Sequence, residues 1–329
     1  MATTLLNFAA PSSRLQRLSR AGSALLRHCT IPLFGIAVFL LLWSVAAARI
    51  ETSLGTFPGP AAVWQQAGNL YEEHRRERVK AAEFYARQEE RNAQRLAQDP
   101  TYEARIRPYT GKATFIDQIK TSLVTVLSGF AIAMAVALPL GIAIGLNRPL
   151  NLALNPLIQL FKPVSPLAWL PLVTMVVSAL YTADEPLFPK SFINSMITVA
   201  LCCLWPMVIN TAVGVASIPQ DLVNVSRVLR LSPLAHVRRI VLPSSVPMIF
   251  TGMRLSLGIA WMVLIAAEML AQNPGLGKFV WDEFQNGSSE SLGRIMVAVF
   301  TIGFIGFLLD RGMQEIQRRV SWDKGTATR

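Results

Sequence analysis

The chain has 329 residues, of which 52% are hydrophobic and only 16% charged, and its net charge is +11. Such a composition excludes an ordinary soluble domain and is typical of a protein that crosses a membrane several times. The excess of Lys and Arg is dispersed between apolar stretches, so a basic nucleic-acid-binding face is not expected. By the positive-inside rule, the segments that carry this excess are expected in the cytoplasm. These segments are residues 1–30, 147–151, 221–243 and 311–329.

The first apolar stretch follows a polar N-terminal arm, residues 1–30, which is rich in Ser and Arg. From His28 to Ala48 the chain has no Asp, Glu, Lys or Arg. That length is enough for one membrane crossing of about 20 residues. We therefore predict a transmembrane helix at 31–48 that leads from the cytoplasm to the outer side. The stretch lacks a clear small-residue cleavage site, so a removable signal peptide is not predicted.

A long charged segment, residues 49–117, comes next and is predicted to lie on the outer side as a helical insert. It opens with a turn signal at Phe57–Pro60. From Ala61 to Gln98 its composition is strongly helical, with no Pro and one Gly, and the whole segment carries eleven basic and ten acidic residues. A nearly neutral segment of this length can be translocated despite its Arg residues. Two interpretations are open: a solvated helix or hairpin that covers the outer face, or a docking surface for an outside partner.

Five further apolar stretches predict five more spans, which gives six in all and places both termini in the cytoplasm. The second span contains a small-xxx-small pattern, Gly141 to Gly145, which lets helices approach closely. Residues 150–181 hold four prolines and predict a short inner-side helix, a Pro-rich break and then the third span. These spans lie in a core at 118–312, and a tail follows at 313–329. The predicted spans are about 119–146, 166–181, 191–220, 247–270 and 291–309.

The fifth predicted span contains two ionisable residues, Arg254 and Glu268. Such residues are costly inside a membrane and usually face the bundle interior, a partner charge or a water path. One interpretation is that each extends to its nearer membrane surface; the other is that one or both line a translocation path. Lys162 is a third candidate, and for an anionic substrate Lys162 and Arg254 have the useful sign, whereas Glu268 would be structural. The candidate pathway residues are Lys162, Pro163, Ser165, Trp169, Arg254, Trp261 and Glu268.

No pattern for catalysis or cofactor binding stands out. Of three cysteines, Cys202 and Cys203 are adjacent within an apolar run and lack metal-ligand spacing, as does Cys29, so all three are interpreted as small buried hydrophobes. There is no phosphate-binding glycine loop and no nucleophile set or catalytic carboxylate pair. We therefore predict that the chain is not an enzyme and binds no cofactor or metal. Any energy for uphill transport would come from another subunit.

A charged interruption between long uncharged stretches is the sequence from Asp221 to Pro243, DLVNVSRVLRLSPLAHVRRIVLP. Pro233 disfavours helical geometry at Ser232. We predict two short helices joined by a turn at this point, outside the hydrocarbon and within a loop at 217–246. The hypothesis is that this segment docks on a partner and transmits force to the membrane helices.

This interruption resembles the cytoplasmic coupling loop of permease subunits of bacterial ATP-binding-cassette (ABC) importers. That loop reads Glu-Ala-Ala, three residues, Gly, nine residues and Ile-x-Leu-Pro. Here 240–243 fits the end of the pattern, and counting back places 224–226 at the Glu-Ala-Ala positions and Arg230 at the Gly position. An arginine there argues against a glycine-type turn, so the break at Ser232 and Pro233 is expected to take its place.

Other stretches are similar to the nitrate, sulfonate and taurine permease group, and the resemblance extends over roughly 50–312. The group signature is carried by 122–133, 161–172 and 204–215. Three more stretches look most like nitrate permeases, and bicarbonate permeases share them. These three are NVSRVLRLSP at 224–233, TGMRLSLGIAW at 251–261 and AAEML at 266–270.

The resemblance implies the type I ABC importer fold, all-α, and a homodimer in the inner membrane with lipid around it. Two ATPase subunits, which hold ATP and Mg, would each receive the coupling helix in a groove, and a periplasmic nitrate-type solute-binding protein would deliver nitrate or nitrite. The alternatives are a bicarbonate, cyanate or sulfonate/taurine importer, an ATP-independent transporter or channel, and a membrane anchor with no transport role. The implied ATPase-coupling residues are Asp221, Asn224, Val225, Ser226, Arg227, Leu229, Arg230, Leu231, Ser232, Pro233 and Pro243.

Overall fold

The computed structural model describes residues 13–52, 55–99, 101–104, 106–182, 187–288 and 290–320, with side chains from Thr30 onward. The regular secondary structure of this part of the chain is helical, apart from a hairpin of two-residue strands, β1 (Glu51–Thr52) and β2 (Gly55–Thr56). The predicted all-α fold is therefore confirmed. Residues 1–12 of the predicted arm and residues 321–329 of the predicted tail lie outside the described residues.

The chain divides into two units, of which the first comprises residues 1–65. Its main element is α1 (Ser13–Ala47), whose segment Thr30–Ala47 is long and apolar enough to cross a membrane. Apolar side chains of this segment are exposed, Phe34 to 72% for example. Exposed apolar side chains suit a helix surrounded by lipid, and the helix agrees in length and position with the predicted first span at 31–48.

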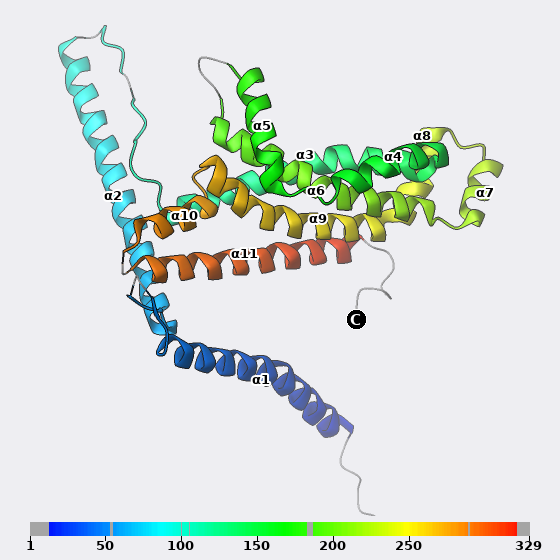
Figure 1. Cartoon of the computed structure of the whole chain (residues 1–329), viewed down its shortest axis with the longest axis horizontal. Helices are drawn as coiled ribbons and strands as arrows, with labels where there is room; N and C mark the ends of the chain where they lie inside the picture. Colours follow the sequence, from blue (N-terminus) through cyan, green and yellow to red (C-terminus); the bar gives the residue numbers. More distant parts are fainter. Residues whose placement is uncertain are drawn as a thin grey trace, which may run out of the picture. The chain divides into compact units, whose positions relative to one another are not determined.

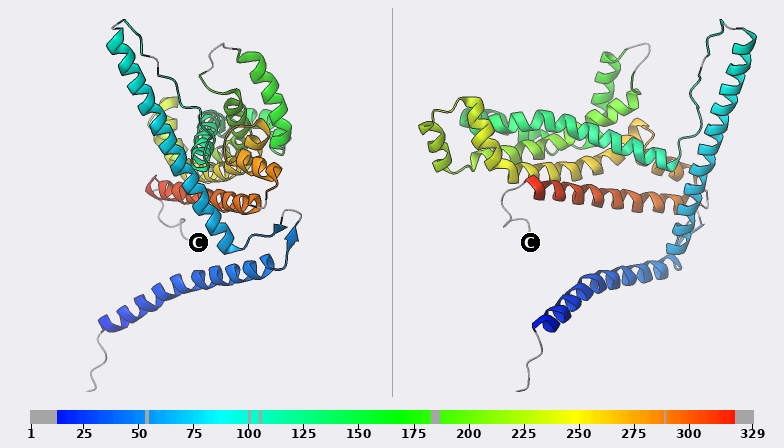
Figure 2. Two further views of the ribbon diagram at one scale, coloured as in Figure 1. Left: turned by 90° about the vertical axis from the view of Figure 1, so that its left-hand side faces the viewer. Right: turned by 180° about the vertical axis from the view of Figure 1, so that it is seen from behind.

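The second unit begins at Gln66, within α2 (Pro60–Gln98). The helix predicted for 61–98 is confirmed as one helix and not a hairpin. The chain then returns alongside α2 in an extended conformation, as Figures 1 and 2 show. The Gln88 side chain pairs with both backbone groups of Arg107, and the Tyr109 hydroxyl donates to Glu77 at 2.7 Å. These bonds hold the return segment against the helix.

The remaining elements form the membrane bundle. Among the described residues of both units, five helices are long and apolar enough to cross a membrane. The number is six if α4 and α5, which are bent by 101° to one another, together count as one span. The predicted six spans agree with the upper number. The elements are α3 (Phe115–Leu146), α4 (Arg148–Phe161), α5 (Pro166–Leu180), α6 (Lys190–Ala216), α7 (Gln220–Val228), α8 (Pro233–His236), the π-helical turn η1 (Val237–Val241), α9 (Leu242–Ala271), α10 (Leu276–Asn286) and α11 (Ser291–Val320).

The helices extend further than the predicted spans. The helix of the fifth span begins at Pro233 and not near 247, because α8, η1 and α9 form one continuous helix. The π turn, in which Leu242 N–H bonds to Val237 O five residues back, accommodates the proline that follows. The loop predicted for 271–290 contains α10, and the last helix continues past 309 to Val320.

The core of the bundle is formed by α3, α6 and α9, which lie side by side in Figures 1 and 2. Along α3, small residues recur every fourth position and face α6. A Cβ added at Gly141 would lie 2.6 Å from the Cβ of Thr211, and one at Gly145 would lie 2.6 Å from that of Val215. The small-xxx-small pattern therefore marks the α3–α6 contact. The small residues are Gly129, Ala133, Ala137, Gly141 and Gly145.

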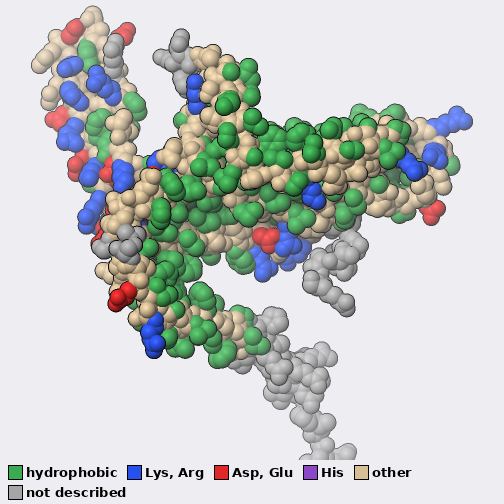
Figure 3. Space-filling model, in the orientation of Figure 1, with side chains coloured by type: hydrophobic (Ala, Val, Ile, Leu, Met, Phe, Trp, Pro, Cys, Tyr) green, Lys and Arg blue, Asp and Glu red, His purple; other side chains and the backbone are tan. Residues whose placement is uncertain are grey.

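The surface of the bundle is mainly hydrophobic, with charged side chains gathered at its ends and along α2 (Figure 3). On its flanks, Met262 is 70% exposed and Phe304 61%. Such an apolar band is expected of a protein whose sides contact lipid. The structure is therefore that of a membrane protein with several spans.

Candidate functional site

The predicted docking loop joins α6 to the fifth span and begins with α7, a helix of nine residues. The first predicted short helix is confirmed, and so is the turn that follows it. The prediction of a second short helix is wrong, because α8 is the first turn of the long helix that continues through η1 into α9. The loop is thus rigidly continuous with α9 on one side.

The turn after α7 centres on Arg230, whose φ of 47° lies in the left-handed region. Leu231 N–H bonds to Ser226 O, and Arg230 N–H bonds to Arg227 O. This pair of bonds is the Schellman motif, in which a left-handed residue ends a helix and satisfies its last carbonyl groups. The expectation that Arg230 would not adopt a glycine-type turn is therefore wrong.

The next helix begins immediately after this turn. Ser232 caps α8 by accepting a hydrogen bond from Ala235 N–H, and Pro233 occupies the first helical turn, where its missing N–H is harmless. The two helices are joined by a hydrogen bond of 2.8 Å between His236 Nδ1 and Ser226 Oγ. The glycine-type turn and the Ser–Pro break therefore act together in one short connection.

The loop packs on the end of the bundle through a small apolar cluster. Val223 of α7 and Ile240 of η1 contact the buried residues Val215, Ile218 and Val241. This cluster fixes the position of α7 against the ends of α6 and η1. It leaves the outward face of the loop uncovered.

That outward face carries exposed apolar side chains. Val228 is 81% exposed, Leu229 63% and Leu234 78%. Exposed apolar side chains in such a group mark an interaction surface. Within the described residues, no acidic partner forms an ion pair with the loop's arginines. These arginines are Arg227, Arg230, Arg238 and Arg239.

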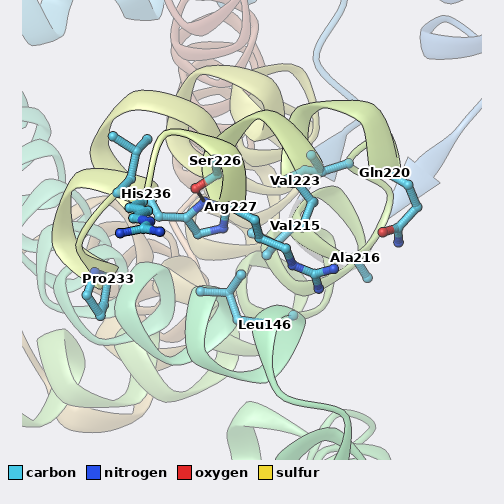
Figure 4. A pocket seen from close by; sticks show the side chains of 13 residues that line it. Leu146, Val215, Ala216, Gln220, Val223, Ser226, Arg227, Pro233 and His236 are labelled. Carbon is cyan, nitrogen blue, oxygen red and sulfur yellow. Dashed lines mark hydrogen bonds between the residues drawn. The ribbon is translucent and has the colours of Figure 1, made fainter.

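The inner side of the loop faces an open pocket of about 640 Å³ between α7, α8 and the ends of α3 and α6. Arg227 extends toward these helix ends, where Leu146 and Ala216 lie, and His236 lies on the α8 side (Figure 4).

The remaining predicted coupling residues lie around this loop. Asp221 and Asn224 are exposed on α7, as is Val225. Leu231 is half-buried in the turn. Pro243 is exposed at the start of α9, behind the π turn. The structure therefore brings the predicted coupling residues together at one end of the bundle, and their role in docking stays a prediction.

Four of the predicted pathway residues lie together at the break between α4 and α5. Lys162 follows α4, its side chain is exposed, and among the described residues no acid pairs with it. Ser165 caps α5 by accepting from Leu167 N–H. Pro163 is exposed, and the Trp169 ring contacts Phe161. The break therefore presents a cation beside an aromatic cluster.

The other three predicted pathway residues lie apart along α9, and each bonds to a different neighbour. Arg254 forms a two-pronged ion pair with Asp310 of α11, with Nη2 and Oδ2 2.9 Å apart. Trp261 donates its indole N–H to Ile302 O, also on α11, at 2.9 Å. Glu268 extends to neither membrane surface, because it is fully buried within the bundle.

The contacts of Glu268 connect three helices. Its carboxylate accepts hydrogen bonds from the Ser122 hydroxyl of α3 and from Gly277 N–H of α10 at 2.8–3.0 Å. Leu276 N–H donates to the same Ser122 oxygen at 2.9 Å. These bonds join the end of α9 to α3 and to the helix after it, which is the geometry of a structural carboxylate.

The sequence analysis did not predict the partners of Arg254 and Glu268. Asp310 could have been predicted as the partner of Arg254, since it is the first acidic residue after the sixth apolar stretch. Ser122 carries no such signal because hydroxyl residues are common in spans. For metals the described residues offer no group of three or more His, Cys, Asp or Glu that could hold an ion.

The fold and the loop define a class: a membrane subunit with several spans that offers a partner-binding loop at one end of its bundle. The profile of the family described as binding-protein-dependent transport system inner membrane component matches residues 137–322. The chain belongs to this family. It is a permease subunit of an ABC importer, a non-catalytic component of the inner membrane, and such permeases assemble with ATPases and a solute-binding protein.

The chain resembles the nitrate and bicarbonate permeases within this family. It is 37% identical over 204 residues to the nitrate import permease protein NrtB of Synechococcus elongatus, over 62% of this chain and 69% of that protein. It is 34% identical over 289 residues to the bicarbonate transport system permease protein CmpB of the same species, over 88% of each chain. Because the identities to NrtB and to CmpB are similar, they assign the chain to the NrtB/CmpB group but do not determine which substrate it transports.

A solved structure of the MetNI methionine ABC transporter, in an inward-facing conformation, has the same fold. It matches with a TM-score of 0.53 at 16% identity, over 63% of this chain and 95% of that one. The predicted type I importer fold is therefore confirmed.

Proposed function

We propose that the chain imports nitrate or nitrite as a homodimer, driven by two ATPase subunits that dock on α7 and the turn after it. The observation that carries the coupling is the exposed apolar face at Val228, Leu229 and Leu234, beside arginines without ion-pair partners in the described chain. An ATPase groove would cover this face. ATP and Mg would be held by those partner subunits.

The proposed orientation follows from charge. The loop with α7 carries four arginines and one acid, so the positive-inside rule places it in the cytoplasm. Both termini are then cytoplasmic, and α2 with its return segment lies in the periplasm. A periplasmic solute-binding protein would deliver the anion at that end of the bundle.

Nitrate is favoured by the stretches shared with nitrate permeases and by identities of 37–38% to NrtB proteins. Bicarbonate is the second candidate, because the similarity to CmpB continues over 88% of the chain. Both are small planar oxyanions, so one pathway chemistry would serve either.

Docking is tested by co-purification of the partner ATPases with the chain. We expect Val228→Asp and Leu229→Asp each to abolish recovery of the ATPase, because a carboxylate would be buried unpaired in the interface. The control is Tyr71→Asp, which changes a side chain that is 61% exposed on α2. Undiminished recovery with both loop variants would contradict the proposal.

The substrate is tested by uptake of labelled nitrate and labelled bicarbonate in a strain that lacks its own transporters for both. We expect nitrate uptake that requires ATP hydrolysis by the partner. Uptake of bicarbonate alone would select the second candidate. Uptake that persists with inactive ATPases would instead favour a secondary transporter or channel.

A further inference from the structure

An aromatic cluster lies where the α4–α5 break meets α6. Its members are Phe161 at the end of α4, Trp169 in α5 and Trp205 in α6. The Phe161 ring is 5.9 Å from each indole, tilted by 34° to Trp169 and stacked at 11° on Trp205. Three helices therefore contribute one ring each to a single contact.

Both indoles keep an unused hydrogen-bond donor. The Nε1 atoms of Trp169 and Trp205 are buried, and neither has a hydrogen-bond partner among the described residues. By contrast, Trp261 Nε1 donates to Ile302 O. A buried N–H without a partner costs free energy, so two in one cluster require an explanation.

The cluster lies near the middle of a helix that is long enough to cross the membrane. Trp205 is midway along this helix, α6 (Lys190–Ala216). Lys162 follows Phe161 directly in the chain, so a cationic residue adjoins the cluster in sequence. Indole N–H groups and an ammonium group donate and do not accept, so together they suit an anion with several acceptor oxygens.

The cluster also lies at a mechanical break. Between α4 and α5 the chain turns through 101°, with Pro163 and Pro166 on either side of the Ser165 cap. Within α6, Pro206 follows Trp205 and removes one backbone hydrogen bond of the helix. Movement of α5 against α6 would open the contact between rings and expose both N–H groups.

We propose that Trp169 and Trp205 are specificity-determining residues that donate their indole N–H groups to the translocated oxyanion, beside Lys162. The inference rests on the proposed function and assigns it a binding site at mid-membrane depth. In this structure the donors are closed off from solvent, and the anion binds when α5 moves away. Binding a small oxyanion then satisfies groups that are otherwise unpaired.

The test uses the permease with its ATPases and solute-binding protein in vesicles, and measures ATP-dependent nitrate uptake over a range of nitrate concentrations. Trp169→Phe and Trp205→Phe remove the N–H and keep an aromatic ring. Each is expected to raise KM roughly tenfold or more, as for loss of a hydrogen bond to a charged ligand. Neither is expected to lower Tm through a lost hydrogen bond, because none is made.

The matched control is Trp281→Phe, which makes the same replacement on α10, where Trp281 packs against Phe284 and not in the cluster. It is expected to leave KM unchanged. Should the smaller phenylalanine ring disturb the cluster, benzothienylalanine at 169 or 205 keeps the bicyclic shape without the N–H. It is expected to raise KM as the phenylalanine variants do.

Unchanged KM in both benzothienylalanine variants would overturn the inference while leaving the proposed function intact. A lower Tm in those variants with unchanged KM would likewise overturn it, and would assign the N–H groups to a contact with the second permease copy. A wild-type complex that transports no oxyanion would refute the proposed function and the inference together.

Discussion

The left-handed conformation of Arg230 gives a prediction about the docking loop. A non-glycine residue in this region has its Cβ close to the following carbonyl oxygen, which costs about 1–2 kcal/mol. Glycine at the same position avoids that cost but loses about 0.5–1 kcal/mol more conformational entropy on ordering. Arg230→Gly should therefore stabilise the turn by a net amount of about 0.5–1 kcal/mol, or roughly two- to fivefold in its opening equilibrium.

The control separates the backbone effect from the loss of the guanidinium group. Arg230→Ala removes the same charge but keeps the Cβ, so its turn should open more readily than that of Arg230→Gly. The direct reporter is the Leu231 amide, which bonds to Ser226 O across the turn at 3.1 Å. Hydrogen exchange at this amide, in the complex with ATPases and without them, measures the opening equilibrium.

The opposite order of protection would refute the reasoning. If Arg230→Ala protects the Leu231 amide as well as Arg230→Gly does, the left-handed turn is not the source of strain. A larger effect on ATP-dependent uptake than on exchange would show that the Arg230 side chain itself contacts the partner. The two variants share the loss of charge, so any such effect should be equal in both.

Three further predictions concern other parts of the chain. Lys162→Ala should reduce uptake more than membrane abundance, measured side by side; equal losses would contradict a pathway role. The Tyr109 hydroxyl donates a hydrogen bond to Glu77 and holds the pKa of that carboxyl below its ordinary value of 4.5. The bond to the ionised carboxylate therefore stabilises the return segment above about pH 4.5, and this stabilisation is lost as the pH falls through the lowered pKa. Exchange protection of residues 106–114, corrected for intrinsic rates, should therefore fall below about pH 4.5, whereas Tyr109→Phe should be less protected at neutral pH and depend less on pH. Gly141→Leu should lower Tm sharply, since overpacking costs about 1–3 kcal/mol or more, whereas Gly303→Leu, where a Cβ would meet no atom within 4 Å, should not; equal Tm values would disprove the close α3–α6 contact.

The spans were predictable because their signal is local. Each is an uncharged stretch of sufficient length, and lipid requires such a stretch wherever the chain crosses. Boundaries at Pro233 and Val320 were not predictable from hydropathy, since both helices continue beyond the hydrocarbon into charged sequence. A helix can leave the membrane without ending, and hydropathy does not record where it stops.

The position of the docking loop in the sequence was predictable, but its backbone conformation was predictable only in part. The spacing from the Ile-x-Leu-Pro end located Arg230 at the turn, whereas residue type alone argued against a left-handed residue there. The two backbone hydrogen bonds of the Schellman motif offset that preference. The pairing of Arg254 with Asp310 and the meeting of Trp169 and Trp205 on either side of Phe161 depend on how distant helices pack, which one sequence does not specify.

The arrangement of α6 suggests how the proposed docking loop and the proposed anion site communicate. The cluster at Val215 and Ile218 ties α7 to the end of α6, and Trp205 lies eleven residues earlier on the same helix. At 1.5 Å per residue, that separation is about 16 Å along one continuous helix. A tilt of α7 therefore moves α6 relative to α5, which opens or closes the ring contact, while the bonds of Glu268 hold the far end of α9. The two proposals then predict one shared behaviour: ATPase docking should change exchange at the α4–α5 break, and Arg230 variants should alter that change without altering the Trp261 contact.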